Sequence, residues 1–197
     1  MCGFKVLIAI ALILWASPAS ADEGSRVRLG GEVDPMKGAV AFCQKLPSRC
    51  EPHPEARVKL DAGRMADLVF INLLVNIGIT FKEELRGVDI WQDRNFSEGD
   101  CEDYALRKRR ELIGLGWPPG ALRLAIIKRK QDDREMHAIL IASTDRGDFV
   151  LDIPGGDTGQ LRVWNSKEFY QLSMVWGADA KWYALAIDTP VILVGAK

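Results

Sequence analysis

Three residue types in this sequence could together activate a nucleophile: a cysteine, a histidine and an aspartate. Cys101 lies in the segment EGDCEDYA, where a helix is expected to begin because Asp100 is a good N-cap residue. Backbone N–H groups and the helix dipole favour a thiolate in a first helical turn, whereas neighbouring carboxylates disfavour it. Cys101 is therefore a candidate nucleophile whose acidic surroundings need an explanation.

The candidate base and its partner lie on two segments that are expected to be strands. His137 stands in the apolar stretch EMHAILIAS, and Asp152 interrupts the apolar stretch FVLDIP. A buried carboxylate is costly unless it is paired, and a buried histidine on the adjacent antiparallel strand would satisfy it. A purely structural role for His137 in the core is the alternative. The second histidine, His53, lies between two prolines in an irregular polar segment.

These residues would form the usual arrangement of nucleophile, base and orienting acid. In the expected reaction His137 takes the proton of Cys101, the thiolate attacks a carbonyl carbon, and water releases the thioester. Asp152 would fix the imidazole tautomer and stabilise the imidazolium. The backbone N–H of Cys101 is one candidate donor to the oxyanion, and the indole N–H of Trp91 is a second. Trp91 could instead serve only to pack its loop.

The elements that must position these residues are helices followed by strands. Apolar residues recur at helical spacing between about residues 54 and 79, among them Leu73 and Ile77, which predicts a long core helix. Residues 39–50 should form a short helix or loop, and a second long helix should run from residue 100 to about 114. The segments ALRLAIIK, MHAILIAS and DFVLDI then predict an antiparallel meander, with KWYALAI as a further strand. This order makes the fold class α+β.

The first residues have the features of a secretory signal peptide. A lysine precedes the apolar run VLIAIALILWA, and SPASA follows with an A-x-A cleavage signal. We expect residues 1–21 to be removed, residues 22–38 to form a flexible mature N-terminus, and residues 39–197 to form one domain. The run is too short to span a bilayer, so no membrane insertion of the mature chain is expected. A periplasmic location follows, and an uncleaved anchor is the alternative.

The cysteine count is informative in an exported protein. The chain has four cysteines, and Cys2 would leave with the signal peptide. Cys43 and Cys50, in the segment FCQKLPSRC, can close a small disulfide ring, which the periplasm permits. Cys101 is then the odd cysteine, and such a cysteine is either reactive, bridged to another chain, or buried and inert.

The charge balance argues against a polyanionic partner. The formal net charge of the 197 residues is -1, which predicts no general attraction to nucleic acid or to anionic membranes. The run RKRR at 107–110 follows three acids on the expected helix and lacks interleaved aromatic residues. A solvated helix face is therefore expected there, although the run could instead dock a regulatory partner.

Several segments resemble a known family. GDCEDYALRKRREL, MHAILIAS and FVLDI, in this order behind the signal peptide and FCQKLPSRC, resemble the bacterial transglutaminase-like cysteine peptidases, the LapG-like periplasmic proteases. The resemblance implies a papain/transglutaminase-like fold with N-terminal helices packed on an antiparallel β-sheet. It implies that Cys101, His137 and Asp152 form the triad. It also implies a protein substrate, in this family a large surface adhesin, and an inner-membrane receptor as regulator.

The resemblance further implies calcium dependence, with the acids beside the cysteine as ligands. Carboxylate oxygens suit Ca²⁺, and a cation on Asp100 and Glu102 would offset their repulsion of a Cys101 thiolate. Asp103 is a further ligand candidate, although it could instead cap the helix start. The alternative is that these acids only complement the helix dipole.

We therefore expect an exported cysteine endopeptidase, and two alternatives stay open. A transglutaminase-like acyltransferase would use the same triad and would pass the acyl group to an amine. A non-catalytic calcium-dependent binding module would retain the triad-like core without needing the cysteine.

Overall fold

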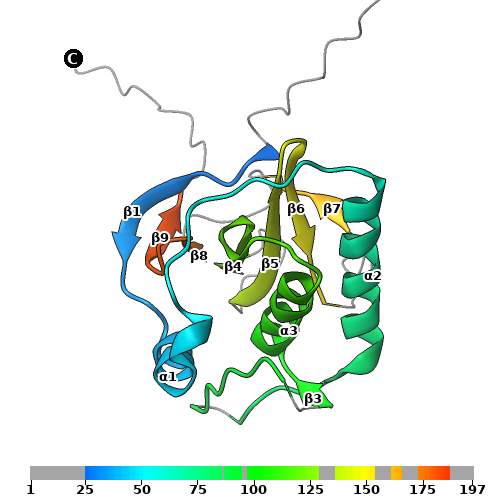
Figure 1. Ribbon diagram of the computed structural model, residues 1–197. Coiled ribbons are helices and arrows are strands. Elements are labelled where there is room, and N and C mark those ends of the chain that lie inside the picture. Colours follow the sequence, from blue (N-terminus) through cyan, green and yellow to red (C-terminus); the bar gives the residue numbers. More distant parts are fainter. Residues whose placement is uncertain are drawn as a thin grey trace, which may run out of the picture.

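The computed structural model describes residues 25–85, 87–94, 97–128, 136–153, 161–165 and 173–186 (Figure 1). The signal peptide expected at residues 1–21 and the apolar segment at residues 191–195 lie outside the described residues. Within the part of the chain that is described, no helix is both long enough and apolar enough to cross a membrane.

Seven of the described strands form one large antiparallel sheet. They are β1 (Leu29–Val33), β4 (Leu122–Ile127), β5 (His137–Thr144), β6 (Gly147–Leu151), β7 (Arg162–Val163), β8 (Met174–Trp176) and β9 (Trp182–Leu185). Their order across the sheet is β1-β9-β8-β4-β5-β6-β7, and each described pairing is antiparallel. The expected meander is therefore confirmed as β4, β5 and β6, with the turn between β5 and β6 closed by Gly147 at φ 115°.

Three α-helices and a small parallel strand pair complete the described fold. The helices are α1 (Lys37–Lys45), α2 (Ala62–Gly78) and α3 (Cys101–Gly114), and the pair joins β2 (Thr80–Phe81) to β3 (Glu98–Gly99). Two short 3-10 turns, Pro47–Arg49 and Pro119–Ala121, connect the elements. The disulfide expected between Cys43 and Cys50 is present and links α1 to the turn after it.

Helix α3 lies across the middle of the sheet, and α2 packs against α3 (Figure 1). Successive side chains of a strand point to opposite faces, so both faces of the sheet carry a core. Leu124 and Leu140 join the cluster beneath the helices, whereas Ile139 and Ile141 join a second cluster on the other face. The α+β fold class is thus confirmed.

The helix expected from about residue 54 begins later. Asp61 caps α2 by accepting a hydrogen bond from the backbone N–H of Arg64 at 2.8 Å, and residues 51–60 are irregular apart from a bridge at Val58. Val58, which the periodicity placed in the helix, forms a β-bridge with Thr144. The local cap and the contact with a distant turn decide the helix start.

The buried face of α2 also differs from the expectation. Leu68, Ile71 and Val75 are buried, whereas Leu73 and Ile77 are 58% and 73% exposed. From Leu68 to Ile77 this helix is apolar on nearly every side, so apolar spacing alone does not select a face.

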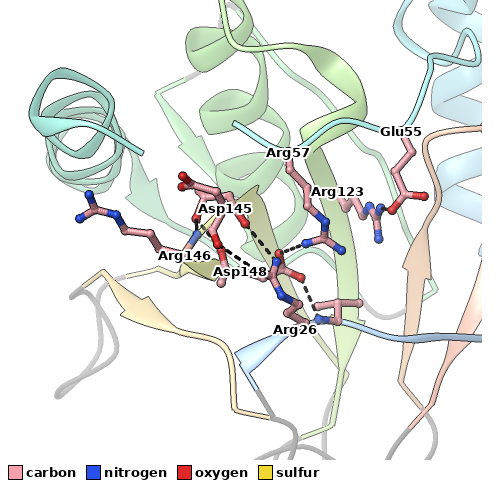
Figure 2. Close-up of polar contacts among 10 residues, drawn as sticks. Arg26, Glu55, Arg57, Arg123, Asp145, Arg146 and Asp148 are labelled. Carbon is pink, nitrogen blue, oxygen red and sulfur yellow. Dashed lines mark hydrogen bonds and ion pairs between the residues drawn. The ribbon is translucent and has the colours of Figure 1, made fainter. Parts of the chain in front are cut away.

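The segment expected to be flexible, residues 22–38, is partly built into the sheet. Residues 29–33 form β1, which pairs with β9. Just before it, the backbone N–H of Val27 donates to fully buried Asp148 at 2.7 Å, and Arg57 pairs with the same carboxylate (Figure 2). Arg26 donates to the carbonyl oxygens of Thr144 and Asp145. These contacts with the β5–β6 turn order a segment that has no strong strand signal of its own.

Candidate active site

His137 and Asp152 come together at one end of the meander. The register pairs Leu140 with Leu151, so Asp152, one residue beyond β6, lies diagonal to His137 at the start of β5. The imidazole Nε2 lies 2.6 Å from Asp152 Oδ1. This is the contact predicted for a buried histidine and aspartate on adjacent strands.

The Asp152 carboxylate is buried and held by further donors. Its side chain is 0% exposed. Oδ1 also accepts the backbone N–H of Ile153 at 2.8 Å, and Oδ2 accepts Arg162 Nη2 at 3.2 Å. These donors offset the cost of burying the charge and hold the carboxylate in one orientation.

The contact with Asp152 selects the tautomer of His137. An ionised carboxylate only accepts hydrogen bonds, so Nε2 of the neutral ring carries the proton and Nδ1 carries the lone pair. The ring is 19% exposed, which leaves it open to a reactant. Nδ1 is therefore the nitrogen that can act as a base.

Cys101 is the first residue of α3 and carries a free, half-buried thiol. Burial raises the pKa of this thiol well above its usual value, and the charge and hydrogen bond of Glu102 raise it further. The backbone N–H of Ala138, the residue after His137, acts in the opposite direction. The thiol thus lies beside the start of β5, but in this conformation its hydrogen bond goes to Glu102 Oε2, at 2.9 Å.

Asp100 and Glu102 place two carboxyl groups in contact. Burial raises the pKa of Asp100 to about 8, with further contributions from the charges of Glu102, Asp103 and Glu84 and from a hydrogen bond with Glu102. Two carboxyl groups in contact need a shared proton or a cation. One oxygen of Asp100, Oδ1, is buried and has no hydrogen-bond partner among the described residues. Hard oxygen donors of this kind, one of them unpartnered, fit Ca²⁺.

Asp103, predicted as a metal-ligand candidate that could instead cap the helix, is held by Gln92. Its carboxylate accepts the backbone N–H and the side-chain Nε2 of Gln92, at 2.9 and 3.1 Å. Burial raises the pKa of Asp103 to about 6 despite these donors. Asp100 occupies the N-cap position but makes no side-chain capping bond. Among the described residues, no three His, Cys, Asp or Glu side chains form a group that could hold a metal ion by themselves.

Trp91 is packed rather than open to a reactant. Its side chain is 4% exposed, and its indole stacks edge-on against Trp182 with ring centroids 6.1 Å apart. The indole N–H donates to Asp89 Oδ1 at 2.6 Å, so it is not available to an oxyanion in this conformation. His53 lies elsewhere, where it lines a hollow of about 310 Å³ together with Arg123.

The run RKRR is not the solvated face that the sequence suggested. Lys108 is 0% exposed and Arg109 is 8% exposed. Lys108 Nζ and Asn76 Nδ2 both donate to the backbone oxygen of Asp152, at 2.7 and 3.0 Å. The sequence analysis assigned no site role to Asn76, Lys108 or Arg162. The sequence did contain an indication for Lys108, because its spacing places it on the same inward face of the helix as Cys101.

A family profile supports a relationship along most of the chain. The profile of the bacterial transglutaminase-like cysteine proteinases matches residues 30–189. No curated protein matches the sequence at a significant level.

Solved structures with a similar fold include LapG of Legionella pneumophila. Its EGTA-treated form aligns with a TM-score of 0.51 and 19% identity, over 66% of this chain and 74% of that chain. Its calcium-bound form aligns with a TM-score of 0.48 and 19% identity, over 64% and 71%. At this identity the likeness concerns the fold alone, and it agrees with helices packed on an antiparallel sheet.

Proposed function

The chain belongs to the bacterial transglutaminase-like cysteine proteinase family and is a cysteine peptidase, and from this premise we propose that Cys101, His137 and Asp152 are its catalytic triad. The observation that carries the proposal is the 2.6 Å contact between His137 Nε2 and Asp152 Oδ1. It orients Nδ1 as a base at the start of β5, where the backbone N–H of Ala138 interacts with the Cys101 thiol.

In the proposed reaction, the Cys101 thiol turns from Glu102 to His137. Nδ1 takes the thiol proton, and the sulfur bonds to the carbonyl carbon of the scissile peptide. The backbone N–H of Cys101, at a helix N-terminus, stabilises the oxyanion. The imidazolium returns the proton to the leaving amine, and water then cleaves the thioester. Asp152 stabilises the imidazolium throughout.

We also propose Ca²⁺ as the cofactor, held by Asp100 and Glu102. Their contact, and the unpartnered Oδ1 of Asp100, support a cation at this position. When bound, Ca²⁺ would supply positive charge that offsets these acids and so favours the Cys101 thiolate. Main-chain carbonyls and water would complete its coordination. Asp103 would join the ligands only if Gln92 released it.

The location, substrate and regulator are further proposals. The signal-peptide features of residues 1–21 support a periplasmic location. The family resemblance supports a large surface adhesin as the protein substrate and an inner-membrane receptor as the regulator.

The test is to identify the bond that the enzyme cleaves. The calcium-loaded enzyme is incubated with surface proteins of bacterial cells, and new N-termini are identified by mass spectrometry. We expect specific new N-termini with the wild type and none with Cys101→Ala or His137→Ala, each assayed at a temperature at which the variant is folded. Product formation by Cys101→Ala would refute the thiol mechanism. Adducts of an added amine such as cadaverine, in place of new N-termini, would indicate an acyltransferase.

A further inference from the structure

The backbone carbonyl oxygen of Asp152 accepts hydrogen bonds from side chains of two helices. Asn76 Nδ2, from the last turn of α2, donates to this oxygen at 3.0 Å. Lys108 Nζ, from the middle of α3, donates to it at 2.7 Å. Asp152 follows the last residue of β6, so these side chains hold the backbone where the described strand has ended.

Lys108 sits in an environment that penalises its charge. The residue is 0% exposed, and its ammonium lies 5.9 Å from the centre of the Tyr104 ring. Burial lowers the pKa of Lys108 to about 7, while the charge of Asp152 acts in the opposite direction. Apolar packing would fill this position without that penalty. A buried ammonium bonded to the backbone of the triad acid therefore needs a reason at the site.

The position of Lys108 on α3 supplies that reason. Lys108 and Cys101 are seven residues apart on one helix, which is about 10 Å along its axis. An α-helix is stiff over this distance. A bond from Lys108 to Asp152 thus connects the helix that carries the thiol to the residue that orients the imidazole.

We propose that Lys108 and Asn76 are positioning residues, which hold Asp152, and through it the His137 ring, at a set place relative to Cys101. Neither residue contacts the reacting atoms. Lys108 connects Asp152 to α3, the helix that carries Cys101, through a hydrogen bond. Asn76 supplies a second hydrogen bond from α2. This inference rests on the proposed triad and assigns two residues that the triad itself does not include.

The first measurement detects the orientation of His137 directly. In the calcium-loaded enzyme with ¹⁵N-labelled histidine, the Nε2–H proton bonded to Asp152 should give a downfield resonance protected from exchange. The chain has two histidines, so His53→Gln identifies the resonance of His137. We expect Lys108→Met to lose or broaden this resonance. We also expect alkylation of Cys101 by iodoacetamide to slow on the order of tenfold, because misplaced catalytic groups lose reactivity steeply.

Arg109 provides a matched control on the same helix. It is 8% exposed and, like Lys108, donates to a backbone carbonyl, Leu122 O, at 3.2 Å. It also lies over an aromatic ring, with its guanidinium 5.1 Å from the centre of Trp176. Arg109→Met therefore removes a comparable buried cation away from Asp152. We expect it to lower the melting temperature while the His137 resonance and the alkylation rate persist.

Asn76 keeps the inference testable if Lys108→Met does not fold. Asn76→Leu removes one of the two donors, and Asn76→Asp places an acceptor against the same carbonyl. We expect exchange of the His137 proton to accelerate in both variants, and more in Asn76→Asp. Equal exchange in the two variants and the wild type would show that the amide only packs.

The inference is overturned if Lys108→Met, or in its place Asn76→Asp, keeps the His137 resonance and alkylates at the rate of Arg109→Met. Failure of the triad gives a different result. In that case His137→Ala retains peptidase activity, whatever the resonance shows. The two failures are therefore distinguishable.

Discussion

The two halves of the candidate site differ in how their charges are satisfied. On the sheet side, buried Asp152 receives donors from His137, Ile153 and Arg162. On the helix side, Asp100 and Glu102 contact each other, and Glu102 also holds the thiol. The sheet half is preorganised by the chain itself, whereas in the described part of the chain no cationic side chain pairs with Asp100 or Glu102.

This difference explains why an acidic cluster can stand beside a nucleophile. Burial raises the pKa of Asp100 and of the Cys101 thiol, and the charges of neighbouring carboxylates raise both further. If the same acids bind a cation, its positive charge favours the Cys101 thiolate. The comparison therefore predicts that the two halves respond differently to substitution, to calcium and to pH.

The largest effect is expected from Asp152→Asn, in the preorganised half. The amide keeps the shape but no longer stabilises an imidazolium, so we expect peptidase activity to fall on the order of 10³-fold. Asp148→Asn is the matched control, because Asp148 is also fully buried and lies on β6. It should lower stability but leave activity per folded molecule. Equal activity of the two variants would contradict a catalytic role that Asp152 has and Asp148 lacks.

The next effect is stabilisation by calcium, in the half that contains Asp100 and Glu102. At a free Ca²⁺ concentration 100 times the Kd, the wild type should gain about 2.7 kcal/mol of unfolding free energy. The melting temperature should then rise by roughly 5–10 °C. We expect Asp100→Asn to lose this rise and Glu111→Gln to keep it, because half-buried Glu111 lies farther along α3 and pairs with Arg107. The same rise in Asp100→Asn would exclude Asp100 as a ligand.

Glu102→Gln should change the thiol in opposite directions with and without calcium. In the metal-free protein the substitution removes a charge and a hydrogen bond that raise the pKa of Cys101. Alkylation by iodoacetamide at neutral pH should therefore accelerate, about tenfold for each unit of pKa lost. With calcium present it should slow, because a ligand is lost. If the alkylation rate changed in the same direction in both conditions, Glu102 would not both raise the thiol pKa without metal and bind Ca²⁺.

The smallest effect concerns the pH dependence of stability without metal. The pKa of Asp100 rises from 3.8 to about 8 in the fold, so between these values the folded protein binds a proton that the unfolded chain does not. Stability is therefore lost as pH rises towards 8. Between pH 5 and pH 7 we expect a loss of about 1 kcal/mol after allowance for solvent screening.

Urea unfolding of the metal-stripped protein at the two pH values measures this loss. Asp103, with its pKa raised to about 6, adds to it with the same sign. Asp100→Asn should flatten the profile, and calcium should do the same in the wild type. A profile that is equally steep in Asp100→Asn would assign the slope to other groups.

The sequence by itself determined the elements whose signals are local. The sequence predicted that α3 begins at Cys101, as it does although Asp100 makes no side-chain capping bond, and Gly147 permits the tight turn between β5 and β6. Alternation along two adjacent antiparallel strands then places His137 and Asp152 on the same face, where each can satisfy the other. The paired half of the site was therefore predictable without coordinates.

Only the tertiary structure decided the contacts that depend on distant partners. Lys108 looked like part of a solvated run, yet its ammonium reaches the backbone of Asp152, 44 residues away in sequence. Asp103 was a candidate cap, yet Gln92 takes its carboxylate. The buried face of α2 and the strand β1 depend in the same way on what packs against them. Local propensity acts within a few residues, whereas the partner of a polar side chain is set by how the whole chain packs.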